Sequence, residues 1–216
     1  MGKRIAIIDA HPDPRGERFC HALAGSYAVA AAAAGHGTRR IVLAELDVPF
    51  LRSSEEWQNG PLPPSLQAAQ EAIGWAEHLV IIYPLWLGSM PALLKAFLEQ
   101  VFRPGFAIAA ERRGPWPGLL QGKSARIVVT MGMPSLVYRL YFLAHSLKSF
   151  ERNILRFSGI GPVRQTLIGQ VDALGDEGRR KWLDRLGQFR FLPDGGRQRQ
   201  SELDAAVAYP AHVFRR

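Results

Sequence analysis

The feature of this sequence that most constrains its fold is an alternation of short apolar runs with segments whose apolar residues recur at helical spacing. The apolar runs are rich in β-branched residues and occupy residues 3–10, 38–45, 78–84, 124–131 and 163–171. Strands that alternate with helices form parallel sheets, and strands that are apolar throughout are covered on both faces. We therefore predict an α/β fold with a doubly wound, five-stranded parallel sheet.

The segments between these runs predict the helices. Residues 19–34, 91–102 and 138–157 carry apolar side chains at a spacing that places them on one helical face. Ser65 is a suitable N-cap for a further helix, and Asp176 is a suitable N-cap for the last one.

Length and composition indicate one substantial domain. The chain has 216 residues, of which 47 % are hydrophobic and 21 % are charged, and this excludes intrinsic disorder as the overall class. Residues 46–64 are rich in proline, so we expect a loop there. We expect a single domain over residues 1–192, followed by a polar tail over residues 193–216.

Cysteine usage and hydropathy bear on the compartment. Cys20 is the one cysteine, so a disulfide framework within the chain and a zinc site built on several thiolates are excluded, and we expect no metal. The uncharged stretch 19–38 is only weakly apolar, and prolines interrupt the stretch 78–94. We expect a cytoplasmic protein without stable membrane insertion.

The net charge is +8, and the isoelectric point is about 10.1. This balance favours anionic partners, and residues 139–164 carry five basic side chains against Glu151 alone. The basic stretch fits either a solvated helix face or a site for the phosphates of a nucleotide. We expect no nucleic-acid partner, because no recognition helix or stacking platform is visible.

Ligands of open α/β sheets bind beyond the carboxyl ends of the strands, so the residues that follow each strand are the candidate site. The segment after the first run carries His11, Arg15 and Arg18 and leads into a helix near Phe19. A helix N-terminus with arginines suits a phosphate, although the segment has neither a dinucleotide fingerprint nor a Walker loop. A polar loop with surface arginines is the alternative interpretation.

The segment after the third run is unusually apolar for a strand end. It reads Tyr-Pro-Leu-Trp-Leu-Gly-Ser-Met-Pro over residues 83–91, and it would expose Trp86 and Leu87 unless a flat group covered them. A planar aromatic cofactor would do so. The alternative is a connection buried under the long Gly- and Pro-rich segment 103–122.

The segment after the fourth run is Thr-Met-Gly-Met over residues 130–133. Gly132 lets the backbone approach a ligand closely. Tyr138 and His145 follow and could donate hydrogen bonds to a developing anion, although a lone Tyr or His on a helix is more often structural.

Read together, these strand ends resemble the flavodoxin-like NAD(P)H:quinone oxidoreductases, the group of DT-diaphorase. His11-Pro12 with Phe19 resembles the family's flavin-phosphate loop, and residues 83–97 resemble its Phe-Pro-Leu…Pro-Ala-Leu-Lys-Gly-Trp segment. Residues 130–133 with Tyr138 resemble its Thr-Thr-Gly-Gly…Tyr segment. The resemblance extends from about residue 3 to residue 190.

The resemblance implies a flavodoxin-like fold and a homodimer that binds FMN, or alternatively FAD. NAD(P)H would reduce the flavin, which would then reduce a quinone or another small aromatic electron acceptor. Tyr138 and His145 would stabilise the reduced flavin as the catalytic residues. The implied cofactor-binding residues are His11, Arg18, Phe19, Cys20, Pro84, Leu85, Trp86, Leu87, Thr130, Met131, Gly132 and Met133.

Some positions depart from the family pattern. Arg18 replaces a small polar residue, Met133 replaces a glycine, and His145 is displaced by one residue. The family's tyrosine-bearing substrate loop is here residues 106–110, which contain no tyrosine, so the acceptor is open among quinones, nitro and azo aromatics. The alternative function is that of a flavin-binding regulatory subunit of a membrane transport system.

Overall fold

The computed structural model describes residues 2–110 and 118–187. Its sheet has five parallel strands in the order β2-β1-β3-β4-β5, which confirms the predicted doubly wound architecture. The strands are β1 (Arg4–Asp9), β2 (Gly37–Val42), β3 (His78–Pro84), β4 (Ser124–Thr130) and β5 (Val163–Ile168).

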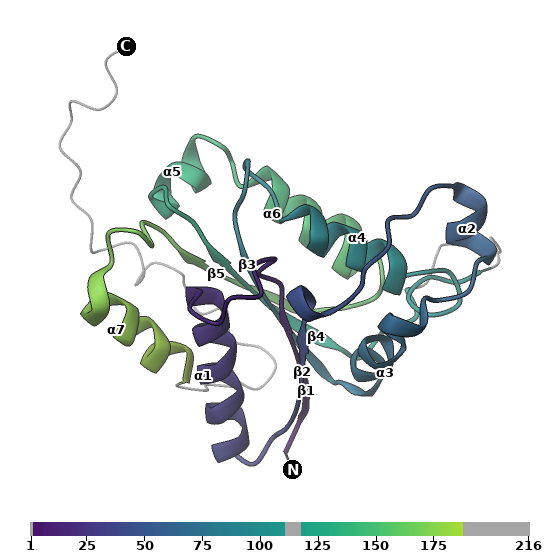
Figure 1. The fold of residues 1–216 in the computed structure, drawn as a ribbon, viewed down its shortest axis with the longest axis horizontal. Coiled ribbons are helices and arrows are strands. Elements are labelled where there is room, and N and C mark those ends of the chain that lie inside the picture. The colour runs from purple at the N-terminus through teal and green to yellow at the C-terminus, as the bar shows by residue number, and fades with distance from the viewer. Residues whose placement is uncertain (1, 111–117, 188–216) are drawn as a thin grey trace.

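Helices cover both faces of the sheet (Figure 1). One face carries α1 (Phe19–Ala33) and α7 (Gly175–Gly187). The other face carries α3 (Gln67–Trp75), α4 (Ala92–Val101) and the helical segment formed by α6 (His145–Ser149) and the π-helix η3 (Phe150–Arg156). The shorter elements are α2 (Ser54–Asn59), α5 (Ser135–Leu140) and the 3₁₀ turns η1 (Leu43–Glu45) and η2 (Pro64–Leu66).

The core consists of two layers separated by the sheet. Successive residues of a strand point to opposite faces, so Ile5 and Ile7 of β1 pack toward α1, whereas Ala6 and Ile8 pack toward α3 and α4. β3 is buried along its whole length, as its apolar sequence predicts. This rigid sheet fixes where the loops at its carboxyl edge begin.

Two expectations for the segment between β2 and β3 were wrong. β2 ends at Val42 rather than continuing to Glu45, and the loop expected over residues 46–64 contains α2. The Ser53 hydroxyl caps α2 by accepting the Glu56 N–H at 3.0 Å, while the Glu56 carboxylate accepts the Arg52 N–H at 3.0 Å. This is close to a capping box, a sequence signal that the prolines obscured.

The expected helix boundaries also need correction. Ser65 lies within η2, where its hydroxyl donates to the Asp47 carbonyl at 2.6 Å, and Asp176 lies inside the first turn of α7, so neither is the N-cap. The continuous helix expected over residues 138–157 starts earlier and breaks at Leu143 and Ala144, whose φ angles are 52° and 49°.

The tail expected over residues 193–216 lies outside the described residues, as do residues 111–117 of the Gly- and Pro-rich segment. Among the residues described, no helix combines the length and the apolar character needed to cross a bilayer.

Candidate functional site at the carboxyl edge of the sheet

The parallel register brings three strand ends together. Asp9 of β1 pairs with Ile82 of β3, and Pro84 of β3 pairs with Thr130 of β4. Because β2 continues on the other side of β1, the strand order reverses between β1 and β3, where ligands of such sheets bind. The three segments that follow these strands therefore form one candidate site.

The start of α1 offers free backbone donors. Arg18 is the N-cap and makes no side-chain capping bond, and the first turn holds no acidic residue. The first intrahelical donors are the N–H groups of His21 and Ala22, which bond to the Arg18 carbonyl at 3.0 and 3.2 Å. Within the described part of the chain the N–H groups of Phe19 and Cys20 make no hydrogen bond, so they remain available to an anion.

Asp13 organises the arginines beside this helix end. Its carboxylate accepts from Arg15 Nη2 at 2.7 Å and from Arg18 Nε at 2.8 Å. The hydrogen bonds with Arg15, followed by those with Arg18, hold the pKa of Asp13 well below its usual range. The two guanidinium groups are thus pre-positioned around one carboxylate.

His11 lies between the apolar segment after β3 and the loop that carries Asp13, Arg15 and Arg18, which we call the charged loop. Its Nδ1 accepts the Asp13 N–H at 3.1 Å, and its ring centroid lies 5.8 Å from that of Trp86. Burial, and then the nearby charges of His21 and Arg18, lower the pKa of His11. A neutral His11 with Nδ1 as acceptor carries its proton on Nε2, which makes that nitrogen a donor.

Cys20 is not a reactive thiol. It is buried, its Sγ lies 3.3 Å from the Thr130 hydroxyl, and burial raises the pKa of the thiol to about 12. Its side chain therefore joins α1 to β4, while its backbone N–H faces the helix end.

The segment after β3 forms a strained apolar hairpin. Trp86 and Ser89 exchange backbone hydrogen bonds of 2.9 Å around Leu87 and Gly88, whose φ angles are 47° and 74°. Two successive positive φ values are typical of a type I′ turn, which a leucine enters only with strain. Pro84 is buried and Leu85 half-buried, whereas the side chain of Trp86 is 48 % exposed and Leu87 is fully exposed.

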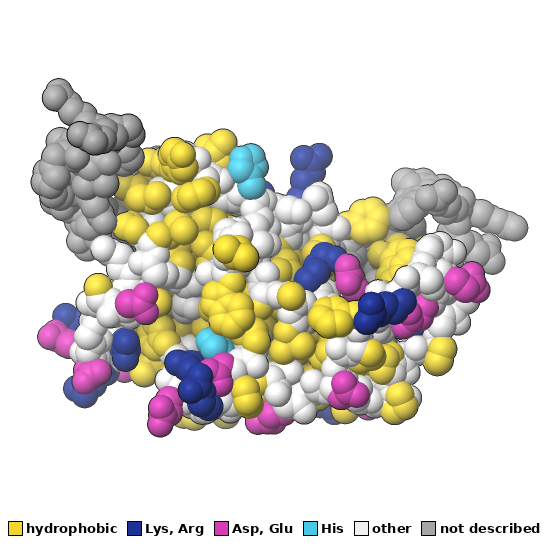
Figure 2. Space-filling view, turned by 45° about the horizontal axis from the view of Figure 1, so that its top comes forward, with side chains coloured by type: hydrophobic (Ala, Val, Ile, Leu, Met, Phe, Trp, Pro, Cys, Tyr) yellow, Lys and Arg dark blue, Asp and Glu magenta, His cyan; other side chains and the backbone are white. Residues whose placement is uncertain are grey.

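The segment after β4 is more enclosed. Thr130 and Met131 are buried and Met133 is half-buried, while Gly132 is exposed and would bring a Cβ within 3.0 Å of the Asp172 carboxylate. Figure 2, in which this edge comes forward, shows hydrophobic side chains gathered beside basic and acidic ones. A polar end and an apolar end of one site thus lie side by side.

The two candidate catalytic residues differ in exposure. Tyr138 is buried, its hydroxyl lies 2.7 Å from the Ser146 hydroxyl, and it accepts the Leu147 N–H at 3.3 Å. These bonds join α5 to α6 rather than leaving the phenol free at the surface. His145 is exposed at the first position of α6.

Sequence reasoning did not assign a role to a buried charged group behind the loop. The Asp9 carboxylate is fully buried, and its Oδ2 lies 2.8 Å from His21 Nδ1 and 2.5 Å from Arg40 Nη2. Its Oδ1 has no hydrogen-bond partner among the described residues. The sequence does contain one sign of this buried group, because Asp9 ends an otherwise apolar strand and a buried charge needs partners.

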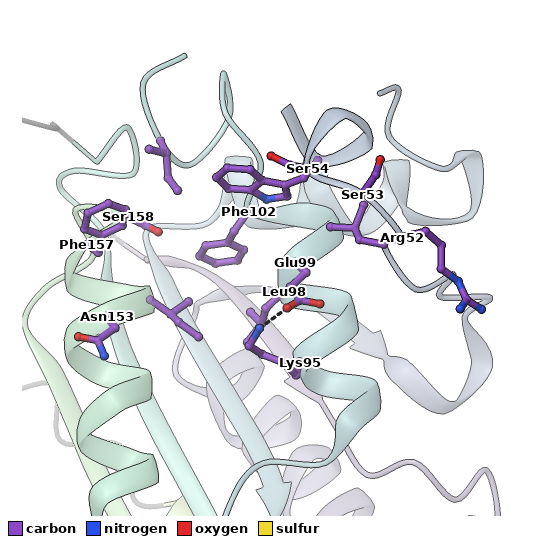
Figure 3. Close-up of a pocket in the computed structure, with 14 residues that line it drawn as sticks. Arg52, Ser53, Ser54, Lys95, Leu98, Glu99, Phe102, Asn153, Phe157 and Ser158 are labelled. Carbon is purple, nitrogen blue, oxygen red and sulfur yellow. Dashed lines mark hydrogen bonds and ion pairs between the residues drawn. The ribbon is translucent and has the colours of Figure 1, made fainter. Parts of the chain in front are cut away.

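A separate hollow of about 590 Å³ lies away from these strand ends, between α4, η3 and residues 51–57 (Figure 3). Trp57, Phe102 and Phe157 line it, together with the ion pair of Lys95 and Glu99. None of the expected site residues contributes to it. The described residues hold no group of three or more metal-ligating side chains.

Comparison with known proteins places this geometry in a family. A family model described as having a flavodoxin-like fold matches residues 3–189. A protein of Haemophilus influenzae named an uncharacterized NAD(P)H oxidoreductase is 30 % identical, over 68 % of this chain and 74 % of that protein. The glutathione-regulated potassium-efflux system ancillary protein KefG of Escherichia coli is 40 % identical, over 46 % of this chain and 62 % of that protein.

Solved structures show the same fold. The NAD(P)H:quinone oxidoreductase of Methanothermobacter marburgensis superposes with a TM-score of 0.73 at 24 % identity, over 87 % of this chain and 94 % of that chain. An FMN-dependent NADH-azoreductase of Bacillus anthracis, in complex with FMN, has a TM-score of 0.65 at 18 % identity, over 87 % and 96 % of the two chains. The protein therefore belongs to the flavodoxin-like fold family, as the resemblance of its strand-end motifs to the NAD(P)H:quinone oxidoreductases predicts.

Proposed function

We propose that the protein is a flavin-dependent oxidoreductase that binds FMN at the carboxyl edge and uses NAD(P)H to reduce a quinone or a similar electron-poor aromatic compound. One juxtaposition carries this proposal. The open N-terminus of α1 with Arg18 adjoins the exposed Trp86, because His11 contacts both the charged loop and the indole ring. A ligand with an anionic tail and a flat apolar ring fits this pair of neighbours.

The donors at the start of α1 bind the flavin phosphate. The N–H groups of Phe19 and Cys20 point along the positive end of the helix dipole, and Arg18 adds charge-assisted hydrogen bonds. His11 contributes the N–H of its Nε2 from the neutral ring. The Cys20 side chain takes no part in the chemistry, because its thiol stays protonated.

The apolar segments hold the ring. Trp86 and Leu87 cover one part of it from the exposed hairpin, with Pro84 and Leu85 as the support beneath them. Thr130, Met131, Gly132 and Met133 border its other edge, where the exposed Gly132 allows close backbone approach. Together these residues orient the ring and exclude water from one side of it.

Bound flavin supplies the two-electron redox chemistry, which no side chain of this protein provides. In this proposal His145, which is exposed at the first position of α6, donates a hydrogen bond toward charge that develops on the ligand. Tyr138 acts indirectly in this proposal: its hydroxyl bonds to Ser146 and to the Leu147 N–H, and these bonds position the start of α6, which carries His145. The nicotinamide and the acceptor would occupy the open side of the ring in turn.

The cofactor is FMN in this proposal and FAD in its alternative form. The similarity of the fold to that of the azoreductase in complex with FMN supports the choice of FMN. We also infer a homodimer, since α5 and the segment after it expose a group of large apolar side chains that a second copy would cover. They are Leu136, Leu140, Tyr141, Phe142 and Leu143.

The absorbance spectrum of the purified protein tests the proposal. We expect a flavin spectrum, either as isolated or after addition of FMN, and consumption of NAD(P)H in the presence of menadione. Chromatography of the released flavin distinguishes FMN from FAD. A protein that stays colourless after saturation with both flavins and dialysis would overturn the proposal.

The similarity to KefG favours a second candidate, a flavin-binding regulatory subunit of a membrane transport system in the cytoplasm. In that case the flavin would act as a sensor. Co-purification with a membrane partner, combined with slow turnover of every acceptor tried, would favour this candidate over the enzyme.

A further inference from the structure

Behind the charged loop lies a network of Asp9, His21 and Arg40, which the proposed function does not use. His21 is 8 % exposed, and its Nδ1 lies 2.8 Å from Asp9 Oδ2. Its other ring nitrogen, Nε2, lies 2.8 Å from the backbone oxygen of Asp13 in the loop before α1. The network therefore connects β1 and β2 to the loop that carries the phosphate-binding groups.

Both hydrogen bonds of His21 end on acceptors. A backbone carbonyl can only accept, and an ionised carboxylate can only accept. Arg40 directs a guanidinium N–H at the same Asp9 oxygen, which favours the ionised carboxylate. Both bonds can form together only when the two ring nitrogens each carry a proton, so His21 is an imidazolium held by Asp9.

The second proton of His21 determines where Asp13 lies. The Asp13 peptide group is bound on both sides, its N–H by His11 Nδ1 and its carbonyl by His21 Nε2. The carboxylate of the same residue holds Arg18. A singly protonated His21 that kept its bond to Asp9 would turn a lone pair toward the Asp13 carbonyl at 2.8 Å, and the loop would have to move.

We propose that His21 is a positioning residue for the binding of a phosphate group. In its doubly protonated form, which the Asp9 carboxylate favours, it fixes Asp13 and thereby holds Arg18 at the end of α1. This inference rests on the proposed function for the identity of the anion as the flavin phosphate. The charged and titratable groups that face His21 are Asp9 from β1, Arg40 from β2, and His11, Asp13 and Arg18 from the loop and the start of α1.

Two variants of His21 that differ by one methylene group separate its two bonds. The amide nitrogen of His21→Asn can replace Nδ1 and keep the bond to Asp9, but it does not reach the Asp13 carbonyl. The amide nitrogen of His21→Gln can replace Nε2 and keep the bond to that carbonyl. We expect the affinity for FMN to fall about tenfold in His21→Asn and to stay within about threefold of the parent protein in His21→Gln.

Riboflavin, which has the ring but no phosphate, is the matched ligand, and its affinity should change in neither variant. His36→Asn, at the far end of α1, is the control substitution and should leave both affinities unchanged. Thermal unfolding of each variant shows whether it is folded. Equal loss of FMN and riboflavin in His21→Asn, or no loss of FMN, would overturn the inference.

Long-range ¹H–¹⁵N NMR reads the state of the ring directly. We expect both nitrogens of His21 to be protonated under conditions where FMN binds. A singly protonated His21 in the free protein would overturn the inference even if no flavin bound, whereas failure of the parent protein to bind either flavin would overturn the proposed function instead.

Discussion

The amino and carboxyl edges of the sheet differ in the residues that adopt a positive φ. In the described residues, connections at the amino edge use glycine alone for a positive φ, at Gly35, Gly105, Gly122 and Gly159, whereas the carboxyl edge uses Gly88 and Gly175 together with non-glycine residues. In the described part of the chain, the non-glycine residues with positive φ all lie in loops beyond the carboxyl edge. They are Leu87, Leu143, Ala144 and Gln170. Left-handed backbone costs a non-glycine residue about 1–2 kcal/mol, so strain is concentrated at the edge that carries the candidate site.

The polar and aromatic side chains at the two edges also differ in burial. The amino edge buries His78 as a neutral ring, 6 % exposed, with its Nδ1 2.8 Å from the Ser124 hydroxyl. The carboxyl edge instead collects charges around Asp13 and exposes Trp86. The polar ring at the amino edge is buried and paired within the fold, whereas the carboxyl edge exposes charged and aromatic side chains at the candidate site.

The largest expected effect is at the charged loop. Arg18→Ala removes the guanidinium from the end of α1 and leaves the Asp13 carboxylate without one of its two cationic partners, so we expect the affinity for FMN to fall about 100-fold, or about 2.7 kcal/mol. Riboflavin should bind within about threefold of the parent protein. Fluorescence titration measures both affinities, and a loss shared equally by the two flavins would contradict a phosphate role for Arg18.

The amino edge should show its own sensitivity, to acid. Burial, followed by the nearby charges of Lys3 and Arg126, lowers the pKa of His78 to about 3, whereas an unfolded histidine titrates near 6.5. Below pH 6.5 the unfolded chain therefore binds a proton that the folded chain does not bind, and the free energy of unfolding falls as the pH falls. At pH 5 the loss due to His78 is about 2 kcal/mol.

His78→Asn removes the titration while keeping a polar atom near Ser124. We expect urea unfolding at pH 7 and pH 5 to show a smaller loss of stability in the variant than in the parent protein. An equal loss in both proteins would show that His78 titrates normally and that the amino edge is not the acid-sensitive one.

The contrast between the edges also explains what the sequence could predict. The strands and their parallel arrangement were predicted from apolar runs that alternate with helical segments. This pattern reflects burial, and β3 was predicted to the residue. The segments of the candidate site were expected at one edge because parallel strands deliver their carboxyl ends there, while the binding role of their side chains stays a prediction. The network of Asp9, His21 and Arg40 was not predicted, because its members are far apart in sequence and only the register of β1 and β2 joins them. The break at Leu143 was missed because helical periodicity carries no sign of a strained residue.

Trp86 tests the apolar half of the carboxyl edge. Trp86→Ala removes the ring that would cover the flavin, and aromatic stacking contributes about 1–1.5 kcal/mol, so the affinities for FMN and riboflavin should both fall about tenfold. Because the side chain is half exposed on a hairpin, the free energy of unfolding should change by less than about 0.5 kcal/mol. A loss of FMN binding alone would contradict the division between a phosphate end and a ring end.

The smallest expected effect is the one that measures the strain itself. Leu87→Gly places glycine at φ 47° in the hairpin after β3 and should stabilise the protein by about 0.5–1 kcal/mol, since relief of the left-handed strain exceeds the entropy that glycine loses. Gly35→Ala is the matched change at the amino edge, where φ is 77° and a Cβ would meet no atom within 4 Å, so its cost comes from the backbone alone. It should destabilise by about 1 kcal/mol. Thermal unfolding resolves opposite shifts of this size, about 2–4 °C per kcal/mol in a chain of this length. If both variants lost stability, Leu87 would adopt its positive φ without strain, and the proposed strain at the carboxyl edge would be absent from this turn.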